Sequence, residues 1–592
     1  MEKQTRPENF VGDIHNKSYL ESYNTNEIVS ENFLADLGRT KESLNGRWNF
    51  GIDQYDTCLR AKWFEEKSVN GEGFRLPLDY SFDKWETMQI PSCWNLHQEK
   101  LFLYEGSMVF TRTFRYVNKG EDRVFIKFGA VNYIARVFLN KEYLGFHKGG
   151  STPFYVEVTG KLQEDNRIIV VVDNTRRSVQ IPCENTDWFN YGGIYRDVEL
   201  IRLPETYIKD YFIHLEPGSD FKKIRVDVSV EGSVQAGNAR LSLPGLNIEA
   251  DIQIEKGYGT LSLECSPELW FPDSPKLYEV NLSYESDQIF DKVGFREIRA
   301  RGTDILLNGE RIFLKGVCCH EESVENGKAI SEAEIVQNIL LAKEMNCNFM
   351  RLAHYPHTER TAQIADEMGM LLWEEIPVYW AIDFENPVTL KDASNQLTEL
   401  ILRDRNRASV IIWSVGNENA DTDYRLSFMS NLARTAKEID PSRLISAACM
   451  TDHVNNRIHD RLIEYLDIIG INEYCGWYSP DFERLPKLFE NSKPEKPVVI
   501  TEFGADAKRG ERGTVDDMGT EDCQENVFKK QVETLGKIPY VKGTSPWILY
   551  DFRCPRRLHY LQDYYNTKGL LTPDKKYKKR AYYIMKDFYS LK

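Results

Sequence analysis

Two glutamates at the ends of apolar runs are the residues of this sequence best suited to chemistry. Glu418 closes the run that begins at Trp413, and Glu502 closes the run that begins at Val498. Because both runs are predicted to be strands buried on both sides, each carboxylate must be hydrogen-bonded or must have a shifted pKa. Facing each other, one as an acid and one as a nucleophile, they could cleave a glycosidic bond. For either glutamate alone, a structural ion pair is an equal alternative.

The runs that would position these glutamates belong to a repeating pattern in the second half of the chain. From residue 300 onward, short apolar runs alternate with amphipathic helical stretches, which is typical of βα units around a parallel sheet. Ser331 and Glu334 form a capping box at the start of one such helix. The pattern predicts a (β/α)₈ TIM barrel. Its predicted strands are 313–317, 348–352, 371–377, 410–415, 444–448, 468–472, 498–503 and 546–552.

A barrel of this kind gathers the residues that follow its strands at one mouth. Polar and aromatic residues stand there in unusual number, with Trp547 expected within the eighth strand: His320, His354, Glu374, Glu375, Asn417, Glu418, Asn472, Tyr474, Glu502 and Trp547. His354 and His357 have no carboxylate at metal-ligand spacing, so we expect a structural role for both. No metal and no other cofactor is expected.

The first half of the chain has the signals of two β-sandwiches. Short strand-like runs separated by Gly, Asn and Asp turns extend to about residue 203. A second strand-rich stretch runs from Pro204 to about Arg299, which is the length of an immunoglobulin-like sandwich.

The amino-acid composition restricts the kinds of molecule that the protein is expected to bind. The 592 residues carry a net charge of −16, which disfavours nucleic acid and means that an anionic substrate would need a local cluster of cationic or amide groups. No window reaches 18 consecutive apolar residues, and the start of the chain is polar, so we expect a cytoplasmic protein without a membrane segment. The 11 cysteines are expected to be reduced and mostly buried.

Three segments together resemble family 2 of the glycoside hydrolases. They are the pair Asn417-Glu418, the segment Thr501-Glu502-Phe-Gly504, and the stretch from Asn185 to Arg196 that contains Asp187. The resemblance covers nearly the whole chain and implies a jelly-roll sandwich over 1–203, an immunoglobulin-like sandwich over 204–299 and a catalytic barrel over 300–592. It also implies a retaining mechanism, with Glu418 as acid/base and Glu502 as nucleophile about 5 Å apart.

The same resemblance implies roles for the surrounding residues. Asn417 would bind the sugar 2-hydroxyl, and Asn472 is counted with the substrate-binding residues. Asp187 and His320 would bind distal hydroxyls, Tyr474 would lie beside the nucleophile, and Trp547 would form the floor of the pocket. Each has a plainer alternative, because Asp187 could cap a turn, His320 could be a hydrogen-bonded core histidine and Trp547 could be ordinary packing.

The identity of the sugar depends on Asn566-Thr-Lys568. Residues two apart lie on one side of an extended segment, so the amide and the ammonium could hold a carboxylate together. Taken alone, such a pair is more often solvated surface. Within the family, however, it is similar to the carboxylate clamp of β-glucuronidases, which favours a glucuronide as substrate. The alternatives are a β-galacturonidase or a β-galactosidase of the same family and, in another class, a non-catalytic carbohydrate-binding protein.

Other features qualify this interpretation. Many β-glucuronidases have an arginine four residues before the clamp asparagine, where this chain has Gln562, and its arginines 556 and 557 lie further upstream.

The stretch 378–390 is short, which predicts an open mouth that admits larger aglycones or the end of an oligosaccharide. We expect a solvated stretch at the start of the last helix, and not a second anion site, from Lys575, Lys576, Lys578, Lys579 and Arg580. Relatives commonly form dimers or tetramers, so a homo-oligomer is consistent with the resemblance.

Overall fold

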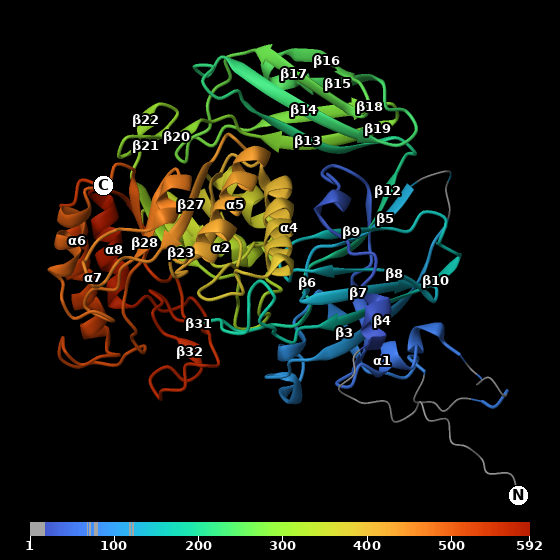
Figure 1. The fold of residues 1–592 in the computed structure, drawn as a ribbon, viewed down its shortest axis with the longest axis horizontal. Helices are drawn as coiled ribbons and strands as arrows, with labels where there is room; N and C mark the ends of the chain where they lie inside the picture. The colour runs from blue at the N-terminus through green and yellow to red at the C-terminus, as the bar shows by residue number, and fades with distance from the viewer. Residues whose placement is uncertain (1–17, 68, 70–72, 76–80, 118–119, 121–122) are drawn as a thin grey trace, which may run out of the picture.

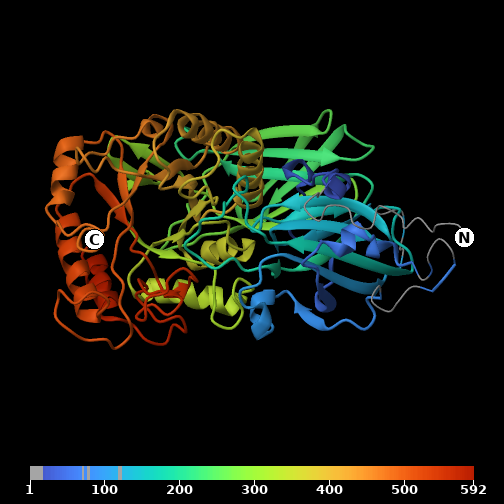
Figure 2. The same ribbon diagram turned by 60° about the horizontal axis from the view of Figure 1, so that its bottom comes forward.

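The computed structural model describes residues 18–592 except 68, 70–72, 76–80, 118–119 and 121–122. In Figure 1 a blue-to-cyan sandwich lies at one end of the molecule, a green sandwich lies above, and the barrel occupies the other end. Figure 2 shows the first sandwich and the barrel at opposite ends of the long axis. Among the described residues, no helix is both long and apolar enough to span a membrane.

The first sandwich consists of two antiparallel sheets around one core. Inward-facing side chains such as Trp48, Phe110 and Ile126 are almost fully buried between the sheets, which explains the short apolar runs of this region. In spatial order the six-stranded sheet contains β3 (Thr87–Ile90), β2 (Gly46–Ile52), β4 (Ser107–Arg115), β10 (Asp165–Asp173), β7 (Ile134–Leu139) and β8 (Glu142–Lys148). The four-stranded sheet contains, also in spatial order, β1 (Lys41–Ser43), β12 (Val198–Leu203), β5 (Arg123–Phe128) and β9 (Phe154–Glu157). Short elements beside them are α1 (Thr57–Arg60), β6 (Val131–Asn132) and β11 (Gly193–Ile194).

The second sandwich packs a three-stranded sheet on a four-stranded sheet. Residues along β14 alternate between buried and partly exposed, as expected for a strand with one face in the core. The sheets contain β13 (Tyr207–Leu215), β14 (Lys223–Glu231) and β17 (Tyr258–Glu264), and β16 (Ile248–Ile254), β15 (Gly237–Leu243), β18 (Tyr278–Tyr284) and β19 (Asp287–Val293). Strands β20 (Ile298–Arg301), β21 (Asp304–Leu307) and β22 (Glu310–Arg311) lead into the barrel.

The second half is a closed barrel of eight parallel strands, which confirms the predicted TIM barrel. The capping box of Ser331 and Glu334 begins the first barrel helix, as predicted. The strands are β23 (Leu314–Cys319), β24 (Phe349–Leu352), β25 (Leu371–Glu375), β26 (Val410–Asn417), β27 (Leu444–Cys449), β28 (Ile469–Asn472), β29 (Val498–Glu502) and β30 (Val541–Thr544). The helices are α2 (Glu332–Glu344), α3 (Glu359–Met368), α4 (Pro387–Asp404), α5 (Asp423–Ile439), α6 (Arg484–Ser492), α7 (Glu521–Leu535) and α8 (Arg580–Ser590).

The predicted eighth strand was wrong. The barrel is closed by β30, which contains Lys542 and Gly543 and therefore has no apolar run to reveal it. The apolar run 546–552 follows the strand. There the backbone N–H of Cys318 donates to the Pro546 carbonyl and that of Trp547 donates to the Phe503 carbonyl. Trp547 is therefore at the mouth of the barrel and not within a strand.

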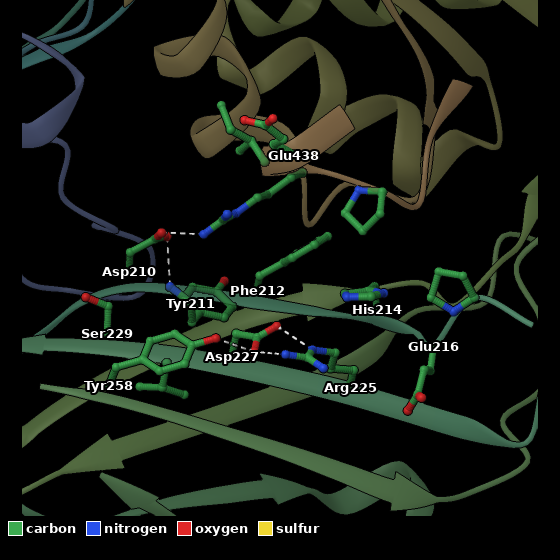
Figure 3. A pocket seen from close by; sticks show the side chains of 15 residues that line it. Asp210, Tyr211, Phe212, His214, Glu216, Arg225, Asp227, Ser229, Tyr258 and Glu438 are labelled. Atoms are coloured by element: carbon green, nitrogen blue, oxygen red, sulfur yellow. Dashed lines mark hydrogen bonds and ion pairs between the residues drawn. The ribbon is translucent and has the colours of Figure 1, made fainter. Parts of the chain in front are cut away.

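A hollow of about 500 Å³ lies where the second sandwich meets the barrel (Figure 3). Its two aspartates are already paired: Asp210 accepts a hydrogen bond from Arg405, and Asp227 accepts from Arg225 (2.9 and 3.0 Å) and from the Tyr258 hydroxyl (2.7 Å). Since Arg405 directly follows α4, its ion pair with Asp210 joins the sandwich to the barrel.

A second junction is formed by the loop between β17 and β18, which packs against α3. Trp270 is fully buried there and donates from Nε1 to the Asp366 carbonyl (2.9 Å). Gly369, with φ of +70°, ends α3 beside the same loop. A Cβ on Gly369 would lie 2.0 Å from the Pro272 carbonyl oxygen. The two units therefore meet backbone to backbone at this glycine.

We expect Gly369→Ala to destabilise the protein by about 2–4 kcal/mol, because left-handed φ strain adds to a backbone clash. Gly302→Ala is the matched control: its φ is +57°, but a Cβ there would meet nothing within 4 Å. The control should lose only the φ contribution of about 1 kcal/mol. Thermal unfolding of both variants measures the difference, and equal losses would contradict the close approach.

Candidate active site

A cavity of about 580 Å³ opens at the carboxyl ends of the barrel strands and contains most of the predicted site residues. The predicted residues that line it are Asp187, Glu418, Tyr474, Glu502, Trp547, Asn566 and Lys568, and the further lining residues are His354, Tyr379, Trp380, Tyr478, Arg556, Arg557, Leu558, His559 and Gln562. His320, Asn417 and Asn472 do not line the cavity, but each contacts or neighbours a residue at its wall, as described below.

Glu502 ends β29 and is almost fully buried. Its Oε1 accepts a hydrogen bond from Arg351 Nη1 (2.7 Å), and its Oε2 accepts one from the Tyr474 hydroxyl (2.7 Å). One cationic and one neutral donor thus fix both oxygens. The arrangement suits an ionised carboxylate held in one orientation.

Arg351 was missed in the sequence analysis, although it is central to the site. Its side chain is fully buried on β24 and donates from Nε and Nη2 to the two oxygens of Glu375 (3.1 and 3.0 Å) and from Nη2 to Asn417 Oδ1 (2.8 Å). Burial raises the pKa of Glu375, but Arg351 and His354 together outweigh it and lower that pKa to about 2. The available signal was a single charged residue in the strand Phe349–Leu352.

Glu418 directly follows β26 and has a different environment from Glu502. Its Oε2 accepts a hydrogen bond from Trp380 Nε1 (2.8 Å), which is a neutral donor. Burial, followed by the negative charge of Glu502, raises the pKa of Glu418 to about 7. A large fraction of Glu418 is therefore protonated at neutral pH, as a general acid requires.

Asn417 and Asn472 form a small amide network beside the two glutamates. Asn417 Oδ1 accepts from Arg351 and from Asn472 Nδ2 (3.2 Å), and Asn472 Oδ1 accepts from the Thr501 hydroxyl (2.7 Å). The Nδ2 of Asn417 is buried and has no hydrogen-bond partner among the described residues. Because an unpaired buried donor is costly, a substrate hydroxyl is a suitable partner for it.

Aromatic and histidine side chains cluster next to this network. Trp547 stacks on the His354 ring (4.8 Å between centroids), and His354 Nδ1 lies 2.7 Å from Glu375 Oε1. His354 thus lines the cavity, where we had expected only a structural role. His320 is buried behind it, with Nδ1 3.0 Å from the Tyr355 hydroxyl, and burial lowers its pKa far enough to keep it neutral.

The pair Asn566 and Lys568 is buried in the structure and is not solvated surface. Lys568 Nζ donates to Asp506 Oδ2 (2.7 Å), and its backbone N–H donates to Asn566 Oδ1 (3.2 Å). Burial lowers the pKa of Lys568, but Asp506 and then Tyr478 together outweigh it, and the net shift is upward. Lys568 therefore stays charged, with one of its three donors occupied by Asp506.

Asp187 reaches the cavity from the first sandwich and is held by barrel residues. Arg557 donates from Nε to Asp187 Oδ1 (3.0 Å) and from Nη2 to Oδ2, and Asn566 Nδ2 donates to Oδ2 (3.0 Å). Asp187 thus links the sandwich to the segment that carries Asn566. Arg557 pairs with Asp187, and Asp506 pairs with Lys568. Because the partners in each pair are distant in sequence, the sequence did not point to Arg557 or Asp506.

Family models and known relatives agree with this architecture. The model "Glycosyl hydrolases family 2, sugar binding domain" matches residues 41–204, "Glycosyl hydrolases family 2" matches 206–296, and "Glycosyl hydrolases family 2, TIM barrel domain" matches 298–591. The β-glucuronidase of Paenibacillus borealis is 27% identical over 600 residues, covering 92% of this chain and 96% of that protein. The human β-glucuronidase is 27% identical over 626 residues, covering 93% and 91%.

Solved structures resemble the whole chain as well. A family 2 β-galacturonidase from Eisenbergiella tayi bound to galacturonate has a TM-score of 0.80 at 26% identity, covering 94% of this chain and 98% of that one. A Bifidobacterium dentium β-glucuronidase complexed with coumarin-3-O-glucuronide has a TM-score of 0.82 at 25% identity, covering 93% and 97%. With models of one family matching in succession from residue 41 to residue 591, the chain belongs to family 2 of the glycoside hydrolases and is an enzyme of that class.

Proposed function

We propose that this enzyme is a retaining β-glucuronidase that releases terminal β-D-glucuronic acid from glucuronides. The observation that carries the proposal is the sharing of one cavity by two carboxylates of different character, Glu418 and Glu502, and by the buried cation Lys568 with Asn566. β-Glucuronidases related over more than nine-tenths of the chain support the same substrate.

In the first step Glu418 donates its proton to the glycosidic oxygen while a carboxylate oxygen of Glu502 attacks the anomeric carbon. The aglycone leaves as an alcohol, and the sugar remains as an ester of Glu502. The hydrogen bonds from Arg351 and Tyr474 hold Glu502 for this attack. The free amide N–H of Asn417 would bind the 2-hydroxyl, where hydrogen bonds strengthen in the transition state.

In the second step the ionised Glu418 takes a proton from water, and the resulting hydroxide attacks the anomeric carbon. The ester bond to Glu502 breaks, which restores the ionised Glu502 and the protonated Glu418. Two inversions at one carbon give net retention.

The sugar carboxylate would be bound by the free donors of Lys568 and by Asn566. Asp506 keeps Lys568 charged, and the guanidinium of Arg557 lines the same cavity. A local concentration of positive charge is what an anionic sugar needs in a protein of net charge −16.

A β-galacturonidase is the second candidate. Galacturonate differs from glucuronate only in the configuration at C4, so the same cations could bind its carboxylate. This candidate is favoured by Gln562, which replaces the arginine of many β-glucuronidases, and by the likeness to the Eisenbergiella tayi structure. Hydrolysis rates on nitrophenyl β-glucuronide, β-galacturonide and β-galactoside distinguish the candidates.

Removing either carboxylate should affect catalysis unequally. Glu502→Gln should lower kcat on nitrophenyl β-glucuronide on the order of a thousandfold or more, because no nucleophile remains. Glu418→Gln should lower it less, by about a hundredfold, because nitrophenolate leaves with little help from an acid.

NMR of the wild-type reaction should detect the β-anomer of the sugar first, and initial release of the α-anomer would contradict retention.

The pH dependence should report Glu418. Since its pKa is raised to about 7, kcat/KM should fall as the pH rises through about 7 and the acid is lost. Trp380 Nε1 stabilises the ionised form, so Trp380→Phe should raise the pKa and move this limb to higher pH. Profiles of kcat/KM for both proteins measure the shift, and movement to lower pH would refute the assignment of the acid.

The carboxylate clamp is tested at Lys568. Lys568→Ala should lower kcat/KM on the glucuronide by roughly a hundredfold, the scale of a lost charge-assisted contact. The exposed Lys508 supplies the control, since Lys508→Ala should change nothing.

Lys568→Ala also leaves the buried Asp506 unpaired, so stability must be separated from binding. The double variant Lys568→Ala/Asp506→Asn should recover the melting temperature without recovering kcat/KM. An unchanged rate in a folded Lys568→Ala protein would end the clamp proposal.

A further inference from the structure

We propose that the natural substrates are acidic oligosaccharides, and that Arg556 binds an anionic group, a carboxylate or a sulfate, on the sugar next to the bond that is cleaved. This inference rests on the proposed function, because it specifies the aglycone for the same site. Three features support it: the position of Arg556, its only partly balanced charge and a second hollow next to the cavity.

Arg556 lies on the aglycone side of the cavity. Its guanidinium carbon is 5.1 Å from the centroid of the Trp380 ring, and Trp380 Nε1 donates to Glu418 Oε2 (2.8 Å). Because Glu418 protonates the oxygen that leaves with the aglycone, groups close to it face the leaving group. A single aromatic side chain, that of Trp380, therefore connects Arg556 to the proposed acid Glu418.

The charge of Arg556 is only partly balanced, because Asp187, the carboxylate with which it pairs, is shared with Arg557. Arg556 Nη1 donates to Asn185 Oδ1 (2.9 Å), which is neutral, and its Nε is 3.8 Å from Asp187 Oδ1. Both oxygens of Asp187 already accept hydrogen bonds from Arg557. The Arg556 side chain is 46% exposed and its ion pair with Asp187 is a long one of 3.8 Å, so its guanidinium remains accessible to an anion.

Arg556 also lines a second hollow, of about 220 Å³, towards the first sandwich. Asn190 and Thr186 contribute polar groups to this hollow, and Trp188 and Phe189 contribute aromatic ones. Such a lining suits the polar edge and apolar face of a sugar ring. Since Arg556 belongs to the walls of both hollows, an aglycone that leaves the catalytic cavity on this side passes it.

The second hollow would not by itself attract an anion. Its other cation, Arg176, is paired with Glu105 through two hydrogen bonds of 2.8 and 3.0 Å. Arg556, which shares one aspartate with Arg557, is thus the less neutralised of these two cations. In an acidic protein that repels polyanions at long range, this local charge would select a negatively charged second sugar over a neutral one.

The test compares substrates that differ only in the second sugar. They are a disaccharide of β-glucuronate linked to a neutral hexose, the same disaccharide with a carboxylate on the hexose, and the same disaccharide with a sulfate. We expect kcat/KM to be about tenfold higher for the preferred acidic disaccharide than for the neutral one, and this preference should decrease as salt is added. The carboxylate and sulfate arms identify which anion is bound.

Variants of Arg556 assign the preference. Arg556→Gln should lower kcat/KM about tenfold on the acidic disaccharide and no more than about threefold on the neutral one, and Arg556→Lys should keep much of the preference. Arg299→Gln is the control, since Arg299 is also exposed (52%) but lies on β20 and does not line the cavity.

Equal rates on acidic and neutral disaccharides in the wild type would overturn the inference, as would equal losses on both in Arg556→Gln. Nitrophenyl β-glucuronide separates this failure from that of the proposed function. If the wild type cleaves it but ignores the second charge, only the inference fails. If the wild type cleaves no glucuronide at all, the proposed function fails and the inference fails with it.

Discussion

One buried guanidinium, that of Arg351, constrains the whole catalytic centre. A cation without access to water is tolerated only where several acceptors surround it, and Arg351 has four of them on the three strands β25, β26 and β29: Glu375, Asn417, Glu502 and the carbonyl of Thr501. The strands must therefore keep the register that brings these oxygens together. A closed barrel provides that register, because each strand is hydrogen-bonded on both sides.

The same guanidinium separates the two glutamates chemically. Glu502 has a positive charge at 2.7 Å, whereas Glu418 is contacted by the neutral indole N–H of Trp380. Burial, followed by the negative charge of Glu502, raises the pKa of Glu418 to about 7. A difference in neighbours thus turns two residues of one type into an acid and a nucleophile in the proposed mechanism.

The sequence predicted the features that are encoded locally. Apolar runs located seven of the barrel strands, and polar residues after them pointed to Glu418, Asn417 and Glu502. The eighth strand was missed because β30 is four residues long and includes a lysine and a glycine. Lys575 and Lys579 were expected to be solvated but are buried, and Lys579 donates to Asp551 and to two carbonyls.

Partners distant along the chain could not be predicted from one sequence. The link between Arg351 and Glu502 spans 151 positions, and the link between Asp187 and Arg557 spans 370. Such pairs depend on how the strands close into a barrel and on how the sandwich packs against that barrel. A local sequence pattern contains no information on either. Most candidate residues of the site could be recognised in the sequence. The interactions on which their proposed roles depend could be described only from the fold.

The position of Asp187 explains why the first sandwich matters to a site that the barrel builds. Asp187 binds Arg557 and Asn566 together, and Asn566 Oδ1 in turn accepts from the backbone of Lys568. The geometry of the proposed carboxylate clamp therefore depends on a side chain from another domain. Because Asp187 pairs with both Arg556 and Arg557, it balances the charge of Arg556 only in part, as the proposed aglycone site requires. One aspartate from the sandwich thus influences both the sugar and the leaving-group sides of the cavity.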